Sequence, residues 1–268
     1  MKTKLWMTAL MLMASASWAN AQEHQTYSGT FGKGDGGTAT YSYYESEDGQ
    51  RVFDGKYTFK KTVKRSGENS TYTENGQYKN DKLEGLWTFT FNISRSWEKV
   101  VGKVTANYKN GLLDGPMHFS RKITEEGKTK TDVYDFQFKE GYLTGKATNL
   151  KIGDWIFTYQ CDENAVPVGI WKKKPDRKGL NWVECAVYTD GKISKSYSEV
   201  PSTGDRTETS SFVFPSDLLD GIRKLLEYPG EMKEQPIRSS VNEIKSKISP
   251  RYDEALKYGL IGVRGYVY

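Results

Sequence analysis

The stretch Leu83-Glu84-Gly85-Leu86-Trp87 is one of four related stretches that decide the fold of this chain. The others are Phe53-Asp54-Gly55-Lys56-Tyr57, Leu113-Asp114-Gly115-Pro116-Met117 and Leu143-Thr144-Gly145-Lys146-Ala147. Their glycines stand at 55, 85, 115 and 145, so the interval is thirty residues each time. A fixed period of this length indicates a repeat architecture, in which each unit buries its apolar face against its neighbours.

Apolar residues around each glycine follow the two-residue period of a β-strand. The positions two before, two after and four after the glycines hold Phe53, Tyr57, Phe59, Leu83, Trp87, Phe89, Leu113, Met117, Phe119, Leu143, Ala147 and Asn149. Asn149 alone among these twelve is polar. The residues between them are mostly polar, which predicts a strand with one buried and one solvated face.

A second strand precedes the glycine in three of the units and ends in a tight turn. The turns are Lys79-Asn80-Asp81, Lys109-Asn110-Gly111 and Lys139-Glu140-Gly141, whose Asn, Asp and Gly residues suit the positive φ of hairpin turns. Each unit is therefore predicted to be a β-hairpin. The remaining polar segments, 61–70, 92–100 and 122–131, are predicted to be longer loops at one end of the stack.

These motifs resemble the MORN repeat (membrane occupation and recognition nexus), particularly its degenerate bacterial variants. Tyr27-Ser28-Gly29-Thr30-Phe31 resembles a divergent first unit, and the pattern Tyr/Phe-Lys-Asn/Glu-Gly/Asp-x-Leu-x-Gly-x-Trp/Met-x-Phe recurs in the later units, over roughly residues 27–193. The resemblance implies one twisted sheet of successive hairpins and a non-catalytic scaffold or binding module that touches lipids or proteins. The unit here is longer than the usual one, so no functional residue is carried over.

The chain is therefore expected to be mainly β, with stacked β-hairpin repeats forming a twisted antiparallel sheet in residues 22–199. Residues 200–214 are predicted to be a polar linker, and residues 215–268 a small helical C-terminal cap, because Leu218, Leu219 and Ile222 recur at helical spacing. A cap would cover an open sheet edge. A docking module for a partner is the alternative, and the sequence leaves that choice open.

Residues 1–21 have the three-part layout of a secretory signal peptide: Lys2 and Lys4, an apolar run from Leu5 to Met13, and small residues up to Ala21. The expected protein is exported, and the sequence does not choose between periplasm, cell surface and medium. No stretch approaches the roughly 18 apolar residues of a transmembrane helix, so no transmembrane segment is predicted.

Composition argues against several classes of function. The formal net charge of +5 is spread along the chain, which disfavours nucleic acid as a partner. The glycine-rich stretch 29–37 lacks the Gly-Lys-Ser/Thr order of a phosphate-binding loop, and with His24 and His118 as the only histidines a catalytic triad or metal site has little to draw on. We therefore expect no enzyme, cofactor or metal, although a glycan hydrolase using paired carboxylates stays open.

Two cysteines, Cys161 and Cys185, lie beside strand-like sequence in the part of the chain expected to be exported. An oxidising compartment favours their pairing, so a Cys161–Cys185 disulfide is predicted. Two buried free thiols are the alternative.

Two sets of residues are candidates for a ligand surface. Lys79, Lys109 and Lys139 follow the last inward aromatic residue of a strand and would form a cationic stripe facing an anionic polymer or membrane. Trp97, Trp171 and Trp182 would stack on sugar rings. The sequence therefore favours an exported, non-enzymatic scaffold or interaction module that binds a protein or an envelope glycan or lipid surface, with a carbohydrate-binding protein as the alternative.

Overall fold

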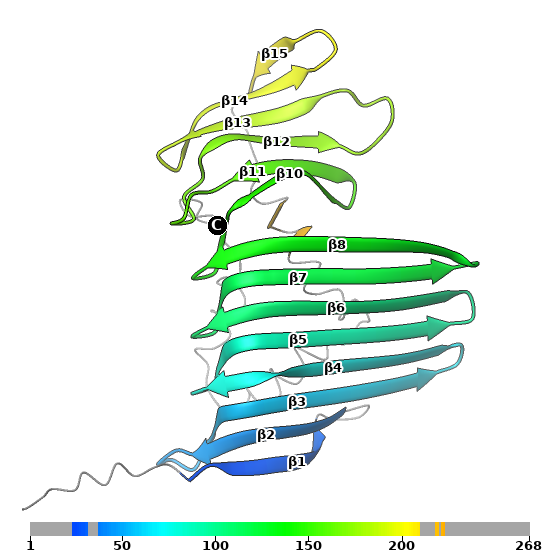
Figure 1. Cartoon of the computed structure of the whole chain (residues 1–268), viewed down its shortest axis with the longest axis vertical. Coiled ribbons are helices and arrows are strands. Elements are labelled where there is room, and N and C mark those ends of the chain that lie inside the picture. Colours follow the sequence, from blue (N-terminus) through cyan, green and yellow to red (C-terminus); the bar gives the residue numbers. More distant parts are fainter. Residues whose placement is uncertain (1–22, 32–36, 210–217, 220, 223–268) are drawn as a thin grey trace, which may run out of the picture.

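A computed structural model describes residues 23–31, 37–209, 218–219 and 221–222 of the chain. The described part is mainly β, as expected, and forms two antiparallel sheets; within each sheet, strands that are consecutive in the chain pair with each other (Figure 1). The larger sheet has the order β1 to β9 and the smaller one the order β10 to β15. The resemblance implied a single sheet, and the break between β9 and β10 corrects that expectation.

The strands of the larger sheet are β1 (Gln25–Phe31), β2 (Gly37–Glu45), β3 (Arg51–Arg65), β4 (Glu68–Lys79), β5 (Lys82–Arg95), β6 (Glu98–Lys109), β7 (Leu112–Glu125), β8 (Lys128–Lys139) and β9 (Tyr142–Thr144). Those of the smaller sheet are β10 (Lys146–Ile152), β11 (Trp155–Gln160), β12 (Gly169–Pro175), β13 (Val183–Thr189), β14 (Lys192–Val200) and β15 (Asp205–Glu208). β15 lies within the segment expected to be a linker.

The turns between the strands lie along two opposite sides of the larger sheet, where the strands end. We call the edge with the turns at 80–81, 110–111 and 140–141 the turn edge, and the opposite one the loop edge. The prediction of longer loops at 61–70, 92–100 and 122–131 is wrong. The strands continue through these segments and are joined by two-residue turns, such as Ser66-Gly67 and Glu126-Gly127 at the loop edge. Lysine and threonine occupy many of the strand positions there, and cross-strand polar pairs hold such strands together.

The first three repeat glycines, Gly55, Gly85 and Gly115, occupy equivalent places within β3, β5 and β7, and Gly145 shares their backbone conformation. All have positive φ, between 65° and 112°, a conformation that favours glycine. Next to each of the first three, the carbonyl of the preceding apolar residue accepts a hydrogen bond from the turn of the following hairpin: Asp81 N–H to Phe53 (2.8 Å), Gly111 N–H to Leu83 (2.9 Å) and Gly141 N–H to Leu113 (2.7 Å). One repeated bond therefore joins each unit to the next.

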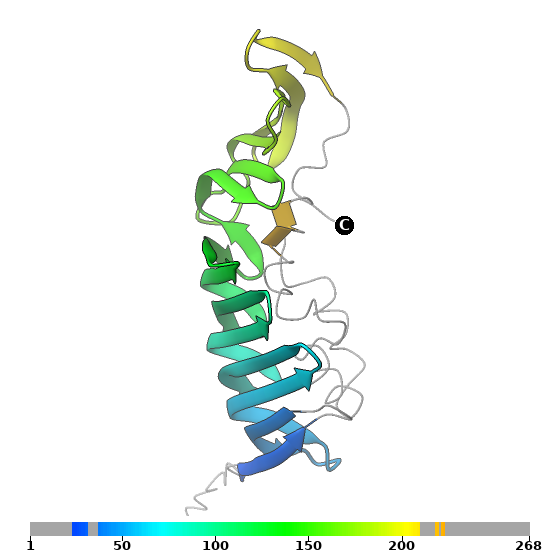
Figure 2. The same ribbon diagram turned by 90° about the vertical axis from the view of Figure 1, so that its right-hand side faces the viewer.

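The inward face of the larger sheet carries a shared apolar layer. Trp87 and Phe119 belong to one buried cluster that also includes Tyr57 and residues of the smaller sheet. Small residues make room for large ones within it. A Cβ on Gly76 would lie 2.2 Å from the Trp87 ring, so the indole can pack here only because residue 76 has no side chain. Seen from the side, the larger sheet is a single twisted layer (Figure 2).

The fourth unit breaks the larger sheet. In the first three units the glycine lies inside a long strand, whereas Gly145 separates β9 from β10. Asn149 stands where the other units have phenylalanine, has a φ of 57°, and lies at a register shift between Ala147 and Leu150. The smaller sheet thus starts at Lys146, just before this irregular position.

The predicted signal peptide at 1–21 lies outside the described residues, as does most of the C-terminal region at 215–268. Leu218, Leu219, Gly221 and Ile222 are helical, and the three apolar side chains are buried in the same cluster as Ile152 of β10. A Cβ on Gly221 would lie 2.8 Å from the Ile152 side chain, so this helical turn packs closely on the start of the smaller sheet.

Candidate functional site

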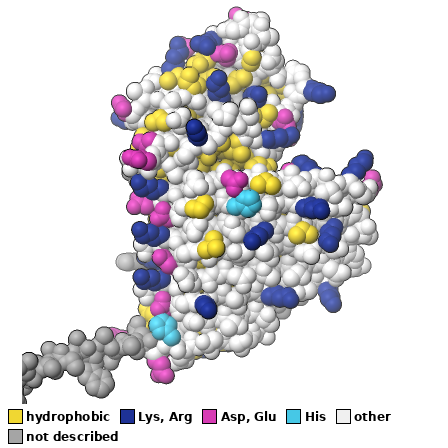
Figure 3. Space-filling model, in the orientation of Figure 1, with side chains coloured by type: hydrophobic (Ala, Val, Ile, Leu, Met, Phe, Trp, Pro, Cys, Tyr) yellow, Lys and Arg dark blue, Asp and Glu magenta, His cyan; other side chains and the backbone are white. Residues whose placement is uncertain are grey.

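Lys79, Lys109 and Lys139 lie at the ends of β4, β6 and β8, so they are aligned along the turn edge. The edge is not purely cationic, because acidic side chains alternate with the basic ones along it (Figure 3). Asp54, Glu84 and Asp114 precede the repeat glycines at this edge and are partly exposed. The turn edge is therefore a row of mixed charge rather than the cationic stripe that was predicted.

Two of the acidic residues, Asp54 and Glu84, hold the backbone of the neighbouring turn. Asp54 Oδ1 accepts a hydrogen bond from the backbone N–H of Asn80 (3.4 Å), and Glu84 Oε2 accepts the equivalent bond from Asn110 (2.9 Å). Asn80 and Asn110 have positive φ in the adjacent turns, where such a bond fixes the backbone. Each carboxylate thus fastens its own unit to the turn of the next one.

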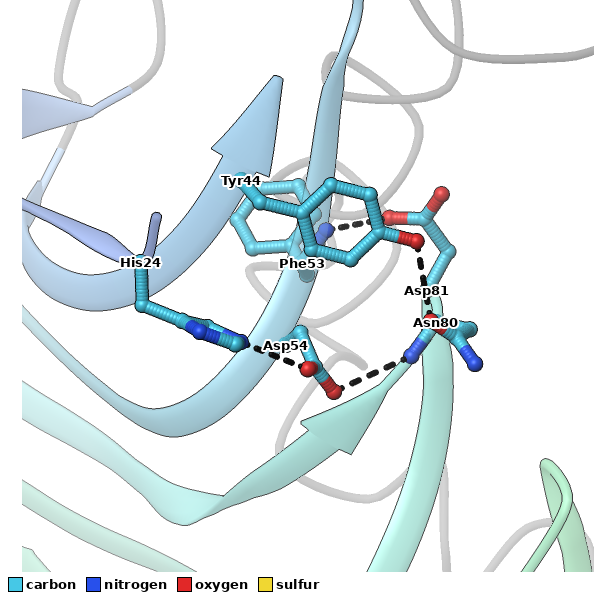
Figure 4. A network of polar contacts seen from close by, with 6 residues as sticks. All are labelled: His24, Tyr44, Phe53, Asp54, Asn80 and Asp81. Carbon is cyan, nitrogen blue, oxygen red and sulfur yellow. Dashed lines mark hydrogen bonds and ion pairs between the residues drawn. The ribbon is translucent and has the colours of Figure 1, made fainter. Parts of the chain in front are cut away.

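At the N-terminal end of the turn edge, these contacts extend into a polar cluster (Figure 4). His24 Nε2 lies 2.7 Å from Asp54 Oδ2, and the Tyr44 hydroxyl donates to Asn80 Oδ1 at 2.9 Å. Asp81 Oδ1 accepts the backbone N–H of Phe53 at 2.7 Å. The cluster joins the residue before β1, strands β2 and β3, and the turn after β4.

Burial raises the pKa of Asp81; the Phe53 N–H bond opposes this shift, and the nearby Asp54 carboxylate adds to it. The pKa of Tyr44 is also raised, first by burial and then by Asp54 and Asp81. His24 is half exposed and lies against the Asp54 carboxylate. The polar groups of the cluster are thus engaged with one another across neighbouring strands.

This cluster was not predicted, although the spacing of His24 and Asp54 in the sequence points to it. His24 stands thirty residues before Asp54, so it occupies the same repeat position as Asp54, Glu84 and Asp114. The thirty-residue period therefore places His24 at a repeat position that is acidic in the next three units. The hydrogen bond between His24 and Asp54 joins two successive residues of this set.

The tryptophan candidates do not share one surface. Trp97 is 60% exposed in the β5–β6 turn, at the loop edge. Trp171 is fully buried and its indole N–H donates to the carbonyl of Gln160 at 2.9 Å, so its assignment to a ligand surface is wrong. Trp182 is half buried and packs edge to face against Trp155, with ring centroids 5.9 Å apart.

The predicted disulfide is also wrong, since Cys161 and Cys185 are both free and buried. Cys161 belongs to the core cluster with Trp171, whereas Cys185 pairs with Lys172 and Tyr197 on the opposite face of the smaller sheet. Two thiols on opposite faces cannot meet in one bond. Burial raises the pKa of the Cys161 thiol to about 12, which makes it unreactive at neutral pH.

In the described ranges no three His, Cys, Asp or Glu side chains are grouped so as to hold a metal ion. No helix within those ranges is long and apolar enough to cross a membrane. Searches of protein-family models, of curated proteins and of solved structures found nothing that matches this chain.

Proposed function

We propose that this chain is an exported, non-enzymatic repeat scaffold that presents one broad sheet face to a partner on the cell envelope. The observation that carries the proposal is the register of the larger sheet. Thr58, Asn75, Thr88, Thr105 and His118 pair in one unbroken row across five neighbouring strands, on the face opposite to the aromatic layer. A broad open surface with one side chain per strand suits binding more than it suits catalysis, which needs a concave, water-excluding site.

The turn edge supports the same proposal. Its carboxylates at Asp54 and Glu84 accept backbone N–H groups of the following turns, which is the role of repeat-joining residues. The glycan hydrolase alternative requires two carboxyl groups that face each other across a cleft, roughly 5 to 10 Å apart. The scaffold proposal needs only the regular surface.

Site-specific cross-linking tests the proposal. A photo-reactive residue in place of Thr88, at the centre of the outward face, is expected to trap a discrete envelope component when the full chain is expressed in its native host. The matched control carries the same residue in place of Lys192, which is exposed on the smaller sheet. Equal products from both positions, or cleavage of envelope glycan by the purified chain, would contradict a scaffold that binds through its larger sheet.

A carbohydrate-binding protein is the second candidate, and one observation favours it. The outward rows consist largely of hydroxyl and amide side chains, such as Thr73 and Thr90, whose hydroxyl oxygens lie 2.5 Å apart. Such groups donate to and accept from sugar hydroxyls. Analysis of the product trapped at Thr88 separates the candidates, because it is either a peptide or a glycan.

A further inference from the structure

The outward face of β3 to β8 carries an excess of positive charge. Between the two edges, six lysines project from it, and all six are exposed: Lys56, Lys60, Lys64, Lys99, Lys103 and Lys122. We call this set the lysine face. It is distinct from the row of Lys79, Lys109 and Lys139, which stands at the turn edge.

Acidic side chains do not balance the lysine face. Among the described residues, Asp135 is the one acid on the outward side of these strands between the edges, and its Oδ1 lies 2.7 Å from His118 Nδ1. Figure 3 shows the result: basic side chains are spread over the face, while acids gather along the turn edge. Strand alternation explains the difference, because Asp132 of the same strand faces inward, where it pairs with Arg121.

Rows of hydrogen-bonding side chains separate the lysines. Lys60, Thr73, Thr90, Lys103 and Ser120 pair in sequence across five strands, next to the row that contains Thr88. Neighbouring strands lie about 4.8 Å apart, so a chain laid across the strands meets a polar group about every 4.8 Å and passes from Lys60 to Lys103 in about 14 Å.

We propose that the lysine face binds an anionic polysaccharide, laid across the strands of the larger sheet. This inference rests on the proposed function and names its ligand class. The lysines would pair with carboxylate or sulfate groups, and the threonine, serine and asparagine side chains between them with the sugar hydroxyls. An anionic membrane would use the lysines but leave these rows without matching partners.

The apolar side chains on this face are few and separated. Leu86, Val101 and Val133 are 58%, 41% and 52% exposed, and they stand in three different rows. Scattered single apolar residues are normal on a protein surface, whereas a surface that inserts into lipid needs a contiguous patch. They therefore favour a hydrated polymer over a bilayer.

The test compares two triple variants of the full chain that lose the same charge. Lys60→Gln/Lys103→Gln/Lys122→Gln removes the centre of the lysine face, and Lys79→Gln/Lys109→Gln/Lys139→Gln removes the turn-edge lysines. The probes are polygalacturonate and dextran sulfate, with neutral dextran as the uncharged control. Affinity is measured by calorimetry at about 50 mM and about 300 mM salt, since salt screens contacts between exposed charges. Unchanged circular dichroism shows that each variant is folded.

We expect the native chain to bind at least one charged polymer but not dextran, with weaker binding at high salt. The lysine-face variant should bind about tenfold more weakly, taking three exposed ion pairs together, and the turn-edge variant within about twofold of the native chain. Equal losses in the two variants, or no binding of either charged polymer, would overturn the inference.

Vesicles of equal parts phosphatidylglycerol and phosphatidylcholine provide a further arm. Binding to these vesicles without binding to the polymers, lost in the lysine-face variant, would overturn the ligand class in favour of an anionic membrane. The cross-linking at Thr88 is read separately. A protein trapped there while the polymers fail to bind would leave the scaffold function standing and remove this inference alone.

Discussion

The two sheets build the same local motif but differ in how far they extend it. Gly85-Leu86-Trp87 in the larger sheet and Gly169-Ile170-Trp171 in the smaller one both begin with a glycine at positive φ, 65° and 71°. Both tryptophans are fully buried, and each indole donates to the carbonyl of a glutamine, Gln77 at 3.0 Å and Gln160 at 2.9 Å. The motif of glycine and tryptophan is therefore independent of the regular period.

The difference lies four residues after the glycine. The larger sheet has Phe59, Phe89 and Phe119 there, and its central strands are 12 to 15 residues long. The corresponding residue in the smaller sheet is Lys173, which is buried with its Nζ 4.0 Å from the centre of the Trp155 ring. Register shifts occur in both sheets, but the strands of the smaller sheet have at most nine residues. The phenylalanine is thus found in the units with long strands, whereas the glycine with positive φ is found in both sheets.

The largest expected effect concerns the two equivalent tryptophans. Trp87→Ala and Trp171→Ala should each lower the free energy of unfolding by about 3 to 5 kcal/mol, because each leaves a cavity in the core. Both belong to one continuous cluster, so each should shift a single cooperative transition in urea, followed by circular dichroism. If Trp171→Ala left the main transition in place and created a second one, the sheets would be separate folding units.

A carboxyl group inside the aromatic layer gives the next effect. Glu74 is 2% exposed, lies between Phe59 and Phe89 on the inward face, and has an Oε1 without a hydrogen-bond partner. The other units have Val104 and Tyr134 at this position. Burial raises the pKa of Glu74 to about 8. The protonated form is therefore favoured in the folded state.

The folded-state pKa of Glu74 is higher than the unfolded-state value of 4.5, so its favourable contribution is complete below pH 4.5 and is lost as the pH rises through about 8. Glu74→Gln should be more stable than the native chain at pH 9 by about 3 to 5 kcal/mol, and equal to it near pH 4. Urea unfolding from pH 4 to 9 measures this, with Asp135→Asn as the exposed control. If the free energy of unfolding changed with pH in the same way for Glu74→Gln and the native chain, burial would not raise the pKa of Glu74.

The smallest effect concerns the junction of the two sheets. Lys139 Nζ donates to the Glu163 carbonyl at 3.1 Å and to Asn164 Oδ1 at 3.2 Å, so it links β8 to the loop after β11. Lys139→Met should lower the melting temperature slightly, by a loss of about 0.5 to 1 kcal/mol, while the exposed Lys109→Met should leave it unchanged. Equal melting temperatures for the two variants would show that this link does not stabilise the junction.

The hairpin unit could be predicted from the sequence, but the full length of its strands could not. Gly55, Gly85 and Gly115 indicated the hairpins, because a positive φ favours glycine and a strand with one buried face alternates apolar and polar residues. The strands between Thr62 and Thr71 were hidden, because polar residues on both faces resemble a loop. The unit in which the two sheets separate is also the one with a polar residue, Asn149, at one of the twelve positions.

The candidate site was harder to predict, because it depends on which face each residue takes. Cys161 and Cys185 looked equivalent beside strand-like sequence, but a single residue of register puts them on opposite faces. The lysine face had the same difficulty: Lys60 and Lys103 are far apart in the chain, and only the pairing of β3 to β6 brings them into one row.

A distance between spin labels tests the in-register stacking most directly. Labels on Thr58→Cys and His118→Cys lie at the same repeat position two units apart, four strand spacings along one row, which predicts a narrow distribution near about 19 Å between the backbone positions. Cys161 and Cys185 are buried and are replaced by alanine in this background. Pulsed electron spin resonance that gave a broad distribution, or one centred beyond about 30 Å, would contradict the stacked repeat and the outward face built on it.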